Sequence, residues 1–551
     1  QNHYDSWLLS GVSGHGARSF YYPEKSQKAC AGCHMPLEES KDFGARLFAG
    51  TDGKFSIHDH TFAAGNTGLP ALRGYLTEVE EKHRKFLEGT MRVDIFGVKE
   101  DASVDSKLLG PIRPVVPPLK PGSQYLLEII VRTLKVGHEF TQGTVDSNEV
   151  WLDVSLQSGD RLIGQSGGMD TKGEVDRRSH FMNVFMLDRH GNRVNRRNPQ
   201  DIFTPLYNHQ IPPGSGQVVH YSFRVPEDLS QPITATVKLQ YRKFDYEYME
   251  IVHKRQQPND NPIATNESHV STPVSSTIST EPGVYRNRLP VLTLATDTVV
   301  FPMEGLSEEP KKSDSKIPGW QRWNDYGIGL FLEGKSELKQ AEQAFQMVEK
   351  LNRFDGPLNL ARVYLREGRI DEAGDAVQRA AKATDPVAPE WTLAWFSGLV
   401  NREQGRLVEA EANFRSIVDQ TTEERRLRGF DFSRDIEVLN TLGRTLFDRA
   451  EQLRLDSQAP ERESLLREAA KQFHRSLAID SENMNAHYNL GLIHGALGET
   501  KLEKKHKSLH LKYKPDDNAQ GLAVRLAREK YPAANSAAEP LVIYPLHTAP
   551  E

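Results

Sequence analysis

The string CAGCH at residues 30–34 has the most specific chemistry in this chain of 551 residues, and it contains both of its cysteines. Two thiols three positions apart match the reach of the two vinyl groups of a porphyrin, and each thiol can add across one vinyl group to form a thioether. The next residue then places an imidazole beneath the iron. The spacing therefore predicts one covalently attached haem c, with Cys30 and Cys33 as thioether residues and His34 as the proximal ligand.

The small number of cysteines limits the other sites that this string could form. A four-cysteine zinc site and a disulfide framework are excluded. A zinc site that recruits His58 and His60 is an alternative, but the spacing fits no common zinc finger. A redox dithiol needs a βαβ context that the flanking sequences do not supply, and a small strained disulfide is the outcome if no haem is ever attached. A haem is the favoured interpretation.

The ligand in the sixth coordination position of the iron decides what the haem can do. A second His, or a Met, fills the sixth coordination position of the iron and favours electron transfer, whereas an open position allows a small molecule to bind and react. The favoured distal ligand is His60, because the glycine-containing stretch after His34 would let the chain fold back over the ring. His58 competes with His60, since residues two apart in an extended segment face the same side. Asp59 or a backbone carbonyl would orient the imidazole.

Three further residues remain open as distal ligands. His15 lies between two glycines that would let a haem approach the backbone. His138 follows a strongly apolar predicted strand, a position where a lone histidine is more often structural. Met169, in a glycine-rich loop, is a more remote alternative. The adjacent Met35 cannot reach the face of the ring opposite to His34.

The strings CAGCHMP at 30–36 and HDHTF at 58–62 resemble the haem segment of multihaem c-type cytochromes that also carry tetratricopeptide repeats. In that family a CxxCHMP string precedes an HDHxF string, and a histidine of the second string is an axial ligand. Residues 60–70 resemble the H-x-F-x-(G/A)-A-N-T-x-x-P stretch of the same proteins. The resemblance implies that His60 or His58 ligates the iron.

A second resemblance to this family concerns His138. The string GHEF at 137–140, followed by EVWL at 149–152 and SG at 166–167, is similar to a pattern whose histidine commonly ligates a haem. The family carries several haem motifs, whereas this sequence has one. The departure leaves His15 and His138 as candidate ligands for haems attached upstream or on a partner chain.

Composition is that of a globular protein, and the predicted haem gives an expectation for its location. Hydrophobic residues make up 37% and charged residues 26%, and a formal net charge of -6 gives no sign of nucleic-acid binding. No apolar run has the ~18 residues that a membrane helix needs. The chain starts at Gln1, so either a signal peptide was removed or the sequence is part of a longer chain. His3 and Trp7 lie so close to the start that we expect a missing upstream portion. Because haem c is attached outside the cytoplasm, a periplasmic or extracellular location is expected.

The sequence predicts a multidomain chain that begins with a haem c segment at 1–90 and an antiparallel β-sandwich at 91–305. The haem segment has one charged, helix-prone stretch at 77–89, in which His83 is expected to be solvated. The sandwich is inferred from segments rich in β-branched and aromatic residues between turn clusters. These segments are 124–134, 149–156, 180–188, 217–226, 233–244 and 288–301, and a long polar loop is expected at 255–284.

An α-helical tetratricopeptide-repeat solenoid is predicted at 319–514, after a polar linker at 306–318. Small residues recur at a fixed offset from a large one, since Gly398 precedes Ala410 by twelve positions and Phe414 follows four later. The small residues would let two helices of one repeat approach, and the large one would fill the gap to the next repeat. The same pattern is found at Gly329, Ala341 and Phe345, at Ala361, Ala373 and Val377, and, with insertions, at Gly443, Ala469 and Phe473 and at Gly491.

The tail at 515–551 contains a short helix and an apolar end, LVIYPL, that would dock on the repeats or pair with a sheet edge.

Within the repeats, His506 and His510 are four positions apart and could hold a metal ion, but a solvated helix face beside several lysines is the favoured interpretation.

Three functions compete. The favoured one is an electron-transfer cytochrome with a six-coordinate, bis-His haem, whose repeats dock a redox partner or another haem-bearing chain. The second is the C-terminal part of a multihaem oxidoreductase that acts on a small nitrogen or sulfur compound. The third is an assembly or filament module stapled by the haem. The sequence contains no nucleophile–base motif, P-loop or GxGxxG string that would support another chemistry. Whether the chain is an enzyme is left open.

Overall fold

The computed structural model describes residues 2–74, 78–141, 145, 147–255, 285–305 and 314–548. Most of the loop expected at 255–284 and of the linker expected at 306–318 lies outside these residues. The chain divides into two compact units. The repeat unit comprises Gln1–Gln27, Pro213–Ser215 and Pro318–Asp517, and the β unit comprises Lys28–Pro212, Gly216–Ile317 and Asn518–Glu551.

This division differs from the expected domain boundaries at two places. The first 27 residues belong to the repeat unit rather than to the haem segment, and the tail after Asp517 belongs to the β unit. Both differences have a physical cause: aromatic side chains of the N-terminal segment pack against the repeats, and the end of the tail adds a strand to a sheet.

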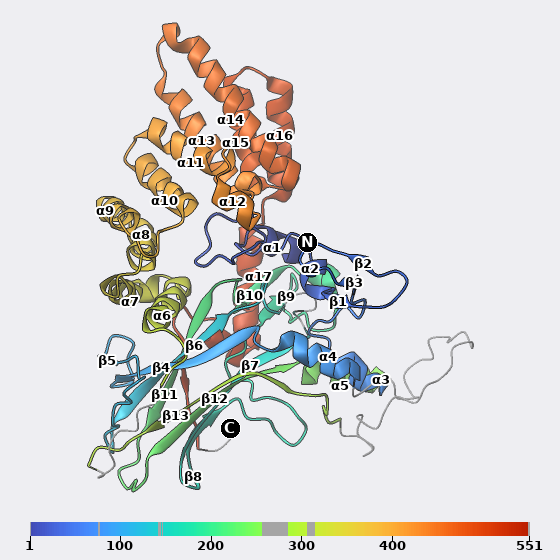
Figure 1. Cartoon of the computed structure of the whole chain (residues 1–551), viewed down its shortest axis with the longest axis vertical. Helices are drawn as coiled ribbons and strands as arrows, with labels where there is room; N and C mark the ends of the chain where they lie inside the picture. Colours follow the sequence, from blue (N-terminus) through green and yellow to red (C-terminus); the bar gives the residue numbers. More distant parts are fainter. Residues whose placement is uncertain are drawn as a thin grey trace. The chain divides into compact units, whose positions relative to one another are not determined.

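Two sheets form the β unit and pack around one hydrophobic core (Figure 1). The first has the order β14 (Ile543–Pro545), β11 (Gly216–Arg224), β6 (Gln124–Thr133), β4 (Met91–Glu100) and β5 (Leu108–Leu109). The second has the order β13 (Leu292–Phe301), β12 (Ile233–Arg242), β7 (Glu149–Ser158) and β8 (Arg161–Ser166). A separate pair comprises β10 (Thr204–Asn208) and β9 (Val184–Leu187).

The side-chain pattern explains these strands. Along β12, Ile233, Ala235, Val237 and Leu239 are all completely buried, while the residues between them are partly exposed. A strand alternates its side chains between its two faces, so this pattern places one face of β12 in the core. The expected β-rich region is therefore confirmed, although β4, β8 and β10 were not predicted from the sequence.

The apolar end of the tail pairs with a sheet edge, one of the two positions expected for it. Strand β14 lies parallel to β11, with Tyr544 opposite Tyr221. An edge strand presents unpaired backbone N–H and C=O groups, which an added strand satisfies. Before this strand the tail forms two helices, α17 (Asp517–Lys530) and α18 (Pro532–Ala537).

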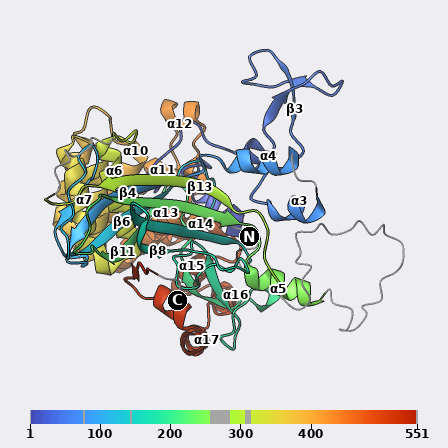
Figure 2. The ribbon, with the colours of Figure 1, turned by 90° about the horizontal axis from the view of Figure 1, so that it is seen from below.

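The segment that contains the CAGCH string forms more regular structure than expected. It comprises α2 (Ala31–His34), the three-stranded sheet of β1 (Leu37–Glu39), β3 (Phe55–His58) and β2 (Arg46–Leu47), and the helices α3 (Gly68–Arg73) and α4 (Glu78–Leu87). Figure 2 shows α3 beside α4, with strand β3 beyond them. Helix α4 packs on the hydrophobic core through Leu87, so one side of this helix is turned away from solvent. The prediction of a solvated His83 was wrong, because this side chain is buried and its Nδ1 lies 2.7 Å from the carbonyl oxygen of Ala64.

Helices stack in pairs throughout residues 319–513 (Figure 1). The pairs are α6 (Gly319–Glu333) with α7 (Leu338–Lys350), α8 (Asp355–Glu367) with α9 (Ile370–Ala381), α10 (Glu390–Glu403) with α11 (Leu407–Val418), α13 (Ile436–Gln452) with α14 (Ala459–Ile479), and α15 (Met484–Ala496) with α16 (Thr500–Tyr513). The remaining helices are α1 (Asn2–Leu8), α5 (Tyr246–Arg255) and α12 (Glu423–Arg428). Of the described helices, none combines the length and hydropathy needed to cross a membrane.

Close contact between a glycine and an aromatic ring joins the helices within a pair. A Cβ atom added to Gly398 would lie 2.5 Å from the ring of Phe414, and one added to Gly443 would lie 2.8 Å from the ring of Phe473. The aromatic residue therefore packs on the glycine of its own repeat. The sequence had predicted a different role for it, in which it fills the gap to the next repeat. In the first pair the glycine against Phe345 is Gly327, not the predicted Gly329.

Replacement of this glycine tests the packing. We expect Gly398→Ala to lower the free energy of unfolding of the repeat unit by about 1–2 kcal/mol, because the cost of overpacking exceeds the gain in helix propensity. The matched control is Gly521→Ala on α17, where no atom lies within 4 Å of the added Cβ and a small stabilisation is expected. Calorimetric unfolding of both variants checks this; a Gly398→Ala chain as stable as the unchanged one would contradict it.

Candidate functional site

The CAGCH string lies on one turn of helix, and this turn positions its three reactive side chains. The backbone N–H of His34 donates to the carbonyl oxygen of Cys30 at 3.0 Å, so Cys30 and Cys33 lie one turn apart on the same side. Both thiols are exposed. Desolvation raises the pKa of the Cys33 thiol, and the neighbouring Cys30 raises it further.

The imidazole of His34 lies close to that of His138. Their ring centroids are 6.3 Å apart, and the two ring planes differ by only 7°. His34 donates from Nδ1 to the carbonyl oxygen of Ala63 at 2.8 Å, and His138 donates from Nδ1 to that of Glu139 at 2.9 Å. A proton on Nδ1 leaves the lone pair of a neutral imidazole on Nε2, so both rings are held in the tautomer that ligates a metal through Nε2.

The distance between the two ring centroids, taken alone, equals the one expected for two imidazoles bound on opposite sides of one metal ion. A metal–nitrogen bond of about 2 Å on each side places two opposed imidazole centroids about 6 Å apart. Burial lowers the pKa of His138, and the nearby His34 lowers it further, while the hydrogen bond to Glu139 opposes this shift. The ring is therefore neutral near pH 7, and the neutral form is the one that binds a metal.

Aromatic and apolar side chains surround this pair of histidines. The ring of His34 stacks on Phe62 with 5.0 Å between centroids, and Phe86 lies at the same distance. The segment around them exposes an unusual number of large apolar side chains, which are Leu37, Phe43, Leu47, Phe55, Phe62 and Leu69. Clustered exposure of this kind marks a surface that an apolar group or a partner covers.

The structure places the other predicted ligands elsewhere. His60 is exposed, and His58 donates from Nδ1 to the carbonyl oxygen of Met35 at 2.7 Å. His15 belongs to the repeat unit, where its Nδ1 lies 2.7 Å from the carbonyl oxygen of Asp431. Met169 is half exposed. Of the candidates for the distal position, His138 is therefore the one whose ring the structure places parallel to that of His34.

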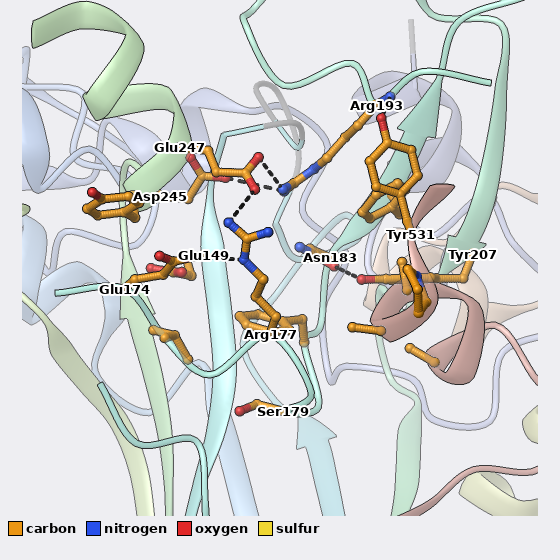
Figure 3. Close-up of a pocket in the computed structure, with 18 of the residues that line it drawn as sticks. Glu149, Glu174, Arg177, Ser179, Asn183, Arg193, Tyr207, Asp245, Glu247 and Tyr531 are labelled. Carbon is orange, nitrogen blue, oxygen red and sulfur yellow. Dashed lines mark hydrogen bonds and ion pairs between the residues drawn. The ribbon is translucent and has the colours of Figure 1, made fainter. Parts of the chain in front are cut away.

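Sequence reasoning missed a cavity of 270 Å³ in the β unit, which charged, aromatic and aliphatic side chains line together (Figure 3). Arg193 lies between two carboxylates, with Nη1 2.8 Å from Glu247 and Nη2 3.3 Å from Asp245. Arg177 contacts Glu247 as well, at 3.3 Å. Burial raises the pKa of Asp245 to about 7, although Arg193 acts to lower it. The cavity therefore becomes more positive as the pH falls through neutrality.

Two buried polar atoms face this cavity without a hydrogen-bond partner among the described residues. They are Oγ of Ser179 and Oδ1 of Asn148. Water or a small polar molecule would satisfy them. No local signal pointed to this cavity, because its walls come from distant segments that include Tyr531 of the tail.

Three buried histidines of the last helix pair, His487, His494 and His506, lie together, with the exposed His474 beside them. His506 is buried, and its Nδ1 lies 3.0 Å from Nδ1 of His487, while the rings of His494 and His474 lie 5.4 and 6.0 Å from it. The expectation that His506 lies on a solvated helix face was wrong, because helix packing turns this position toward α15. In the described part of the chain, no three His, Cys, Asp or Glu side chains converge as a metal site would require.

Comparison with known proteins identifies the repeats. A tetratricopeptide repeat family model matches residues 358–424, which run from α8 to α12. No curated protein matches the chain significantly. The C-terminal region is thus a solenoid of tetratricopeptide repeats, as the sequence predicted.

Several solved structures resemble this region at low identity. YrrB, a tetratricopeptide repeat protein with an unusual peptide-binding site, is 17% identical over 37% of this chain and 89% of its own, with a TM-score of 0.26. MamA is 10% identical over 36% of this chain and 96% of its own, with a TM-score of 0.27. The Cut9–Hcn1 complex of the APC/C matches at 15% identity over 38% of this chain and 36% of its own, with a TM-score of 0.28.

The buried histidine cluster predicts sensitivity to acid. Burial lowers the pKa of His506 to about 4, and the neighbouring His487 and His494 act in the same direction. Between pH 6.5 and 4 the unfolded chain binds a proton at this position and the folded chain does not, so the free energy of unfolding falls as the pH falls. We expect His506→Asn to flatten the fall in Tm over this range. The matched variant His510→Asn should leave the slope unchanged, and equal slopes for both variants would contradict the prediction.

Proposed function

We propose that this protein is an extracytoplasmic c-type cytochrome that carries electrons through one six-coordinate haem and docks a partner protein through its repeats. The haem c would be attached at Cys30 and Cys33, with its iron between His34 and His138. The observation that carries this proposal is the near-parallel pair of imidazoles, whose ring centroids lie 6.3 Å apart and whose planes differ by 7°. Separate chain segments supply the two rings, which lie 104 positions apart in the sequence, so local sequence does not explain their approach.

His138 is proposed as the distal ligand in place of His60. His60 is exposed, whereas His138 lies beside His34 in the metal-binding tautomer. The resemblance of the GHEF string to a haem-ligating pattern supports the same choice. His60 and His58 are left as candidates for contact with another haem or a partner.

The protein groups around this site would tune a haem rather than react themselves. When bound, a haem supplies a one-electron iron couple. The carbonyl oxygens of Ala63 and Glu139 orient the two imidazoles through Nδ1. Two strong axial ligands leave no position for a substrate, which favours electron transfer over catalysis. A haem attached in this way also implies a periplasmic or extracellular location.

Partner docking is the second component of the proposal. Stacked helix pairs form an extended surface that binds other chains, and the tetratricopeptide repeats of this chain belong to that architecture. The partner is proposed to be a redox protein or another haem-bearing chain.

Attachment of the haem is tested by export of the whole chain into a bacterial periplasm with cytochrome c maturation enzymes. We expect a Soret band that survives denaturation and an intact mass larger by one haem, because thioethers are covalent. The double variant Cys30→Ala/Cys33→Ala should lose both. A colourless chain whose two thiols both react with an alkylating agent would overturn the proposal.

Separate replacement of His138 and His60 distinguishes between these two candidate distal ligands. We expect His138→Ala to convert a low-spin haem into a high-spin form that binds carbon monoxide when reduced, because it opens the sixth position. His60→Ala is the matched control and should keep the low-spin spectrum. The opposite result, in which only His60→Ala changes the spin state, would show that His60 is the distal ligand.

A further inference from the structure

The N-terminal segment of the chain lies along the repeats within the repeat unit. Its backbone is paired with theirs at both ends: the carbonyl oxygen of Gly14 accepts from the N–H of Asp431 at 2.8 Å, and the N–H of Ser26 donates to the carbonyl oxygen of Arg428 at 2.9 Å. Between these points the chain has no helix or strand of its own. An extended segment held by backbone hydrogen bonds and side-chain pockets is how folded domains bind peptides.

Tyr21 is the best-defined contact of this segment. Its hydroxyl donates to Oδ1 of Asp325 at 2.8 Å and accepts from Nδ2 of Asn324 at 2.9 Å. Asn324 in turn accepts from Nδ2 of Asn359 at 2.9 Å, which links α6 to α8. All three repeat side chains are at least 97% buried. Buried polar groups of this kind are costly to leave unpaired, so the groove strongly favours a hydroxyl at this position.

The neighbouring aromatic residues fill apolar sites on the next helices. Tyr22 meets the ring of Trp391 edge-on at 5.3 Å, and its hydroxyl lies 3.3 Å from Oγ1 of Thr392. Burial raises the pKa of Tyr22. Phe20 packs against Phe331 of α6 at 6.3 Å. Large aromatic side chains in pockets are the usual anchors of an interface.

Two arginines of the repeats hold the backbone of the segment, and Arg362 also lies over the ring of Phe20, 4.4 Å from its centroid. Arg362 donates to the carbonyl oxygens of Arg18 and Ser19 at 3.1 and 3.2 Å, and Arg428 donates to that of Pro23 at 2.8 Å. Burial lowers the pKa of Arg362 to about 10, which still leaves it charged at neutral pH. The hydrogen bonds from these arginines go to backbone carbonyl oxygens, so other extended sequences with an aromatic residue at the position of Phe20 would also fit.

The contacts come from one face of successive repeats, namely α6, α8, α10 and the turn before α13. A cavity of 330 Å³ remains beside the segment, lined by Tyr21, Tyr22 and residues of these helices. The segment therefore fits the groove without filling it. A larger side chain at one of these positions would gain contacts.

We propose that residues 10–27 are an internal ligand of the groove along α6, α8, α10 and the start of α13, and that a docking partner enters this groove with an extended Phe-Tyr-Tyr-type segment that displaces them. Because the internal ligand is tethered, it competes at an effective concentration in the millimolar range. Cys30 follows the segment by only three residues, so displacement would release the chain that leads to the CAGCH string. The inference does not require that a haem be attached.

Cleavage of the full chain tests retention of the internal ligand. A site-specific protease sequence is inserted between Gln27 and Lys28, and the cleaved protein is passed over a size-exclusion column. We expect the peptide to co-elute with the rest of the chain, and to do so at least tenfold less in Arg362→Met. Arg379→Met, whose exposed guanidinium pairs with a glutamate of α7, is the matched control and should retain it. Loss of the peptide from the unchanged sequence, with the helical circular dichroism preserved, would overturn the proposal.

Binding in trans gives a second measurement that needs no cleavage. A fluorescent synthetic peptide of residues 10–27 is titrated into the full chain and into the variant Tyr21→Ala/Tyr22→Ala, whose internal ligand is weakened. We expect the variant to bind the peptide at least tenfold more tightly than the unchanged chain, and a scrambled peptide to bind neither. Equal affinity of the two chains for the peptide would show that the segment does not occupy the peptide site, whether or not a haem is present.

Discussion

Burial of apolar side chains between the two sheets is the constraint on which the candidate haem site depends. The same core contains Leu87 of α4 and both Val136 and Phe140, which flank His138. Phe86, the neighbour of Leu87, packs against this core and also contacts the ring of His34. Because one hydrophobic core fixes both sides, two imidazoles from distant parts of the sequence are held parallel and at a separation suited to one metal ion.

The repeats follow a different constraint, in which steric fit between single residues sets the helix spacing. Gly398 and Gly443 leave room for the rings of Phe414 and Phe473, so each pair closes with its aromatic inside. Stacking of such pairs leaves a continuous face that carries buried polar residues. On this chain that face holds Asn324, Asp325 and Arg362, and they contact the N-terminal segment.

The two proposed activities meet at the N-terminal segment. If the haem and the groove both act as proposed, the docking of a partner and the state of the haem segment are linked by the short stretch between Ser26 and Cys30. Such a link needs a segment that stays bound to the groove without a partner but gives way to a competing peptide. The cavity that remains beside the segment is consistent with this intermediate affinity. The cavity near Asp245 is a separate feature of the β unit. Two of its lining residues, Asn148 and Ser179, each carry a buried side-chain oxygen with no hydrogen-bond partner in the described part of the chain.

The sequence by itself determined the features that depend on local spacing. The CAGCH string, the offset between Gly398 and Phe414, and the alternation along β12 each reflect a short-range geometric rule, so they could be recognised without coordinates. Only the tertiary structure decided which distant residues meet. It placed His138 rather than His60 beside His34, buried His83 and His506, and laid the first 27 residues along the repeats. The physical reason is that these outcomes depend on how the cores pack, and the side chains that decide the packing are spread over hundreds of positions, where no local pattern records them.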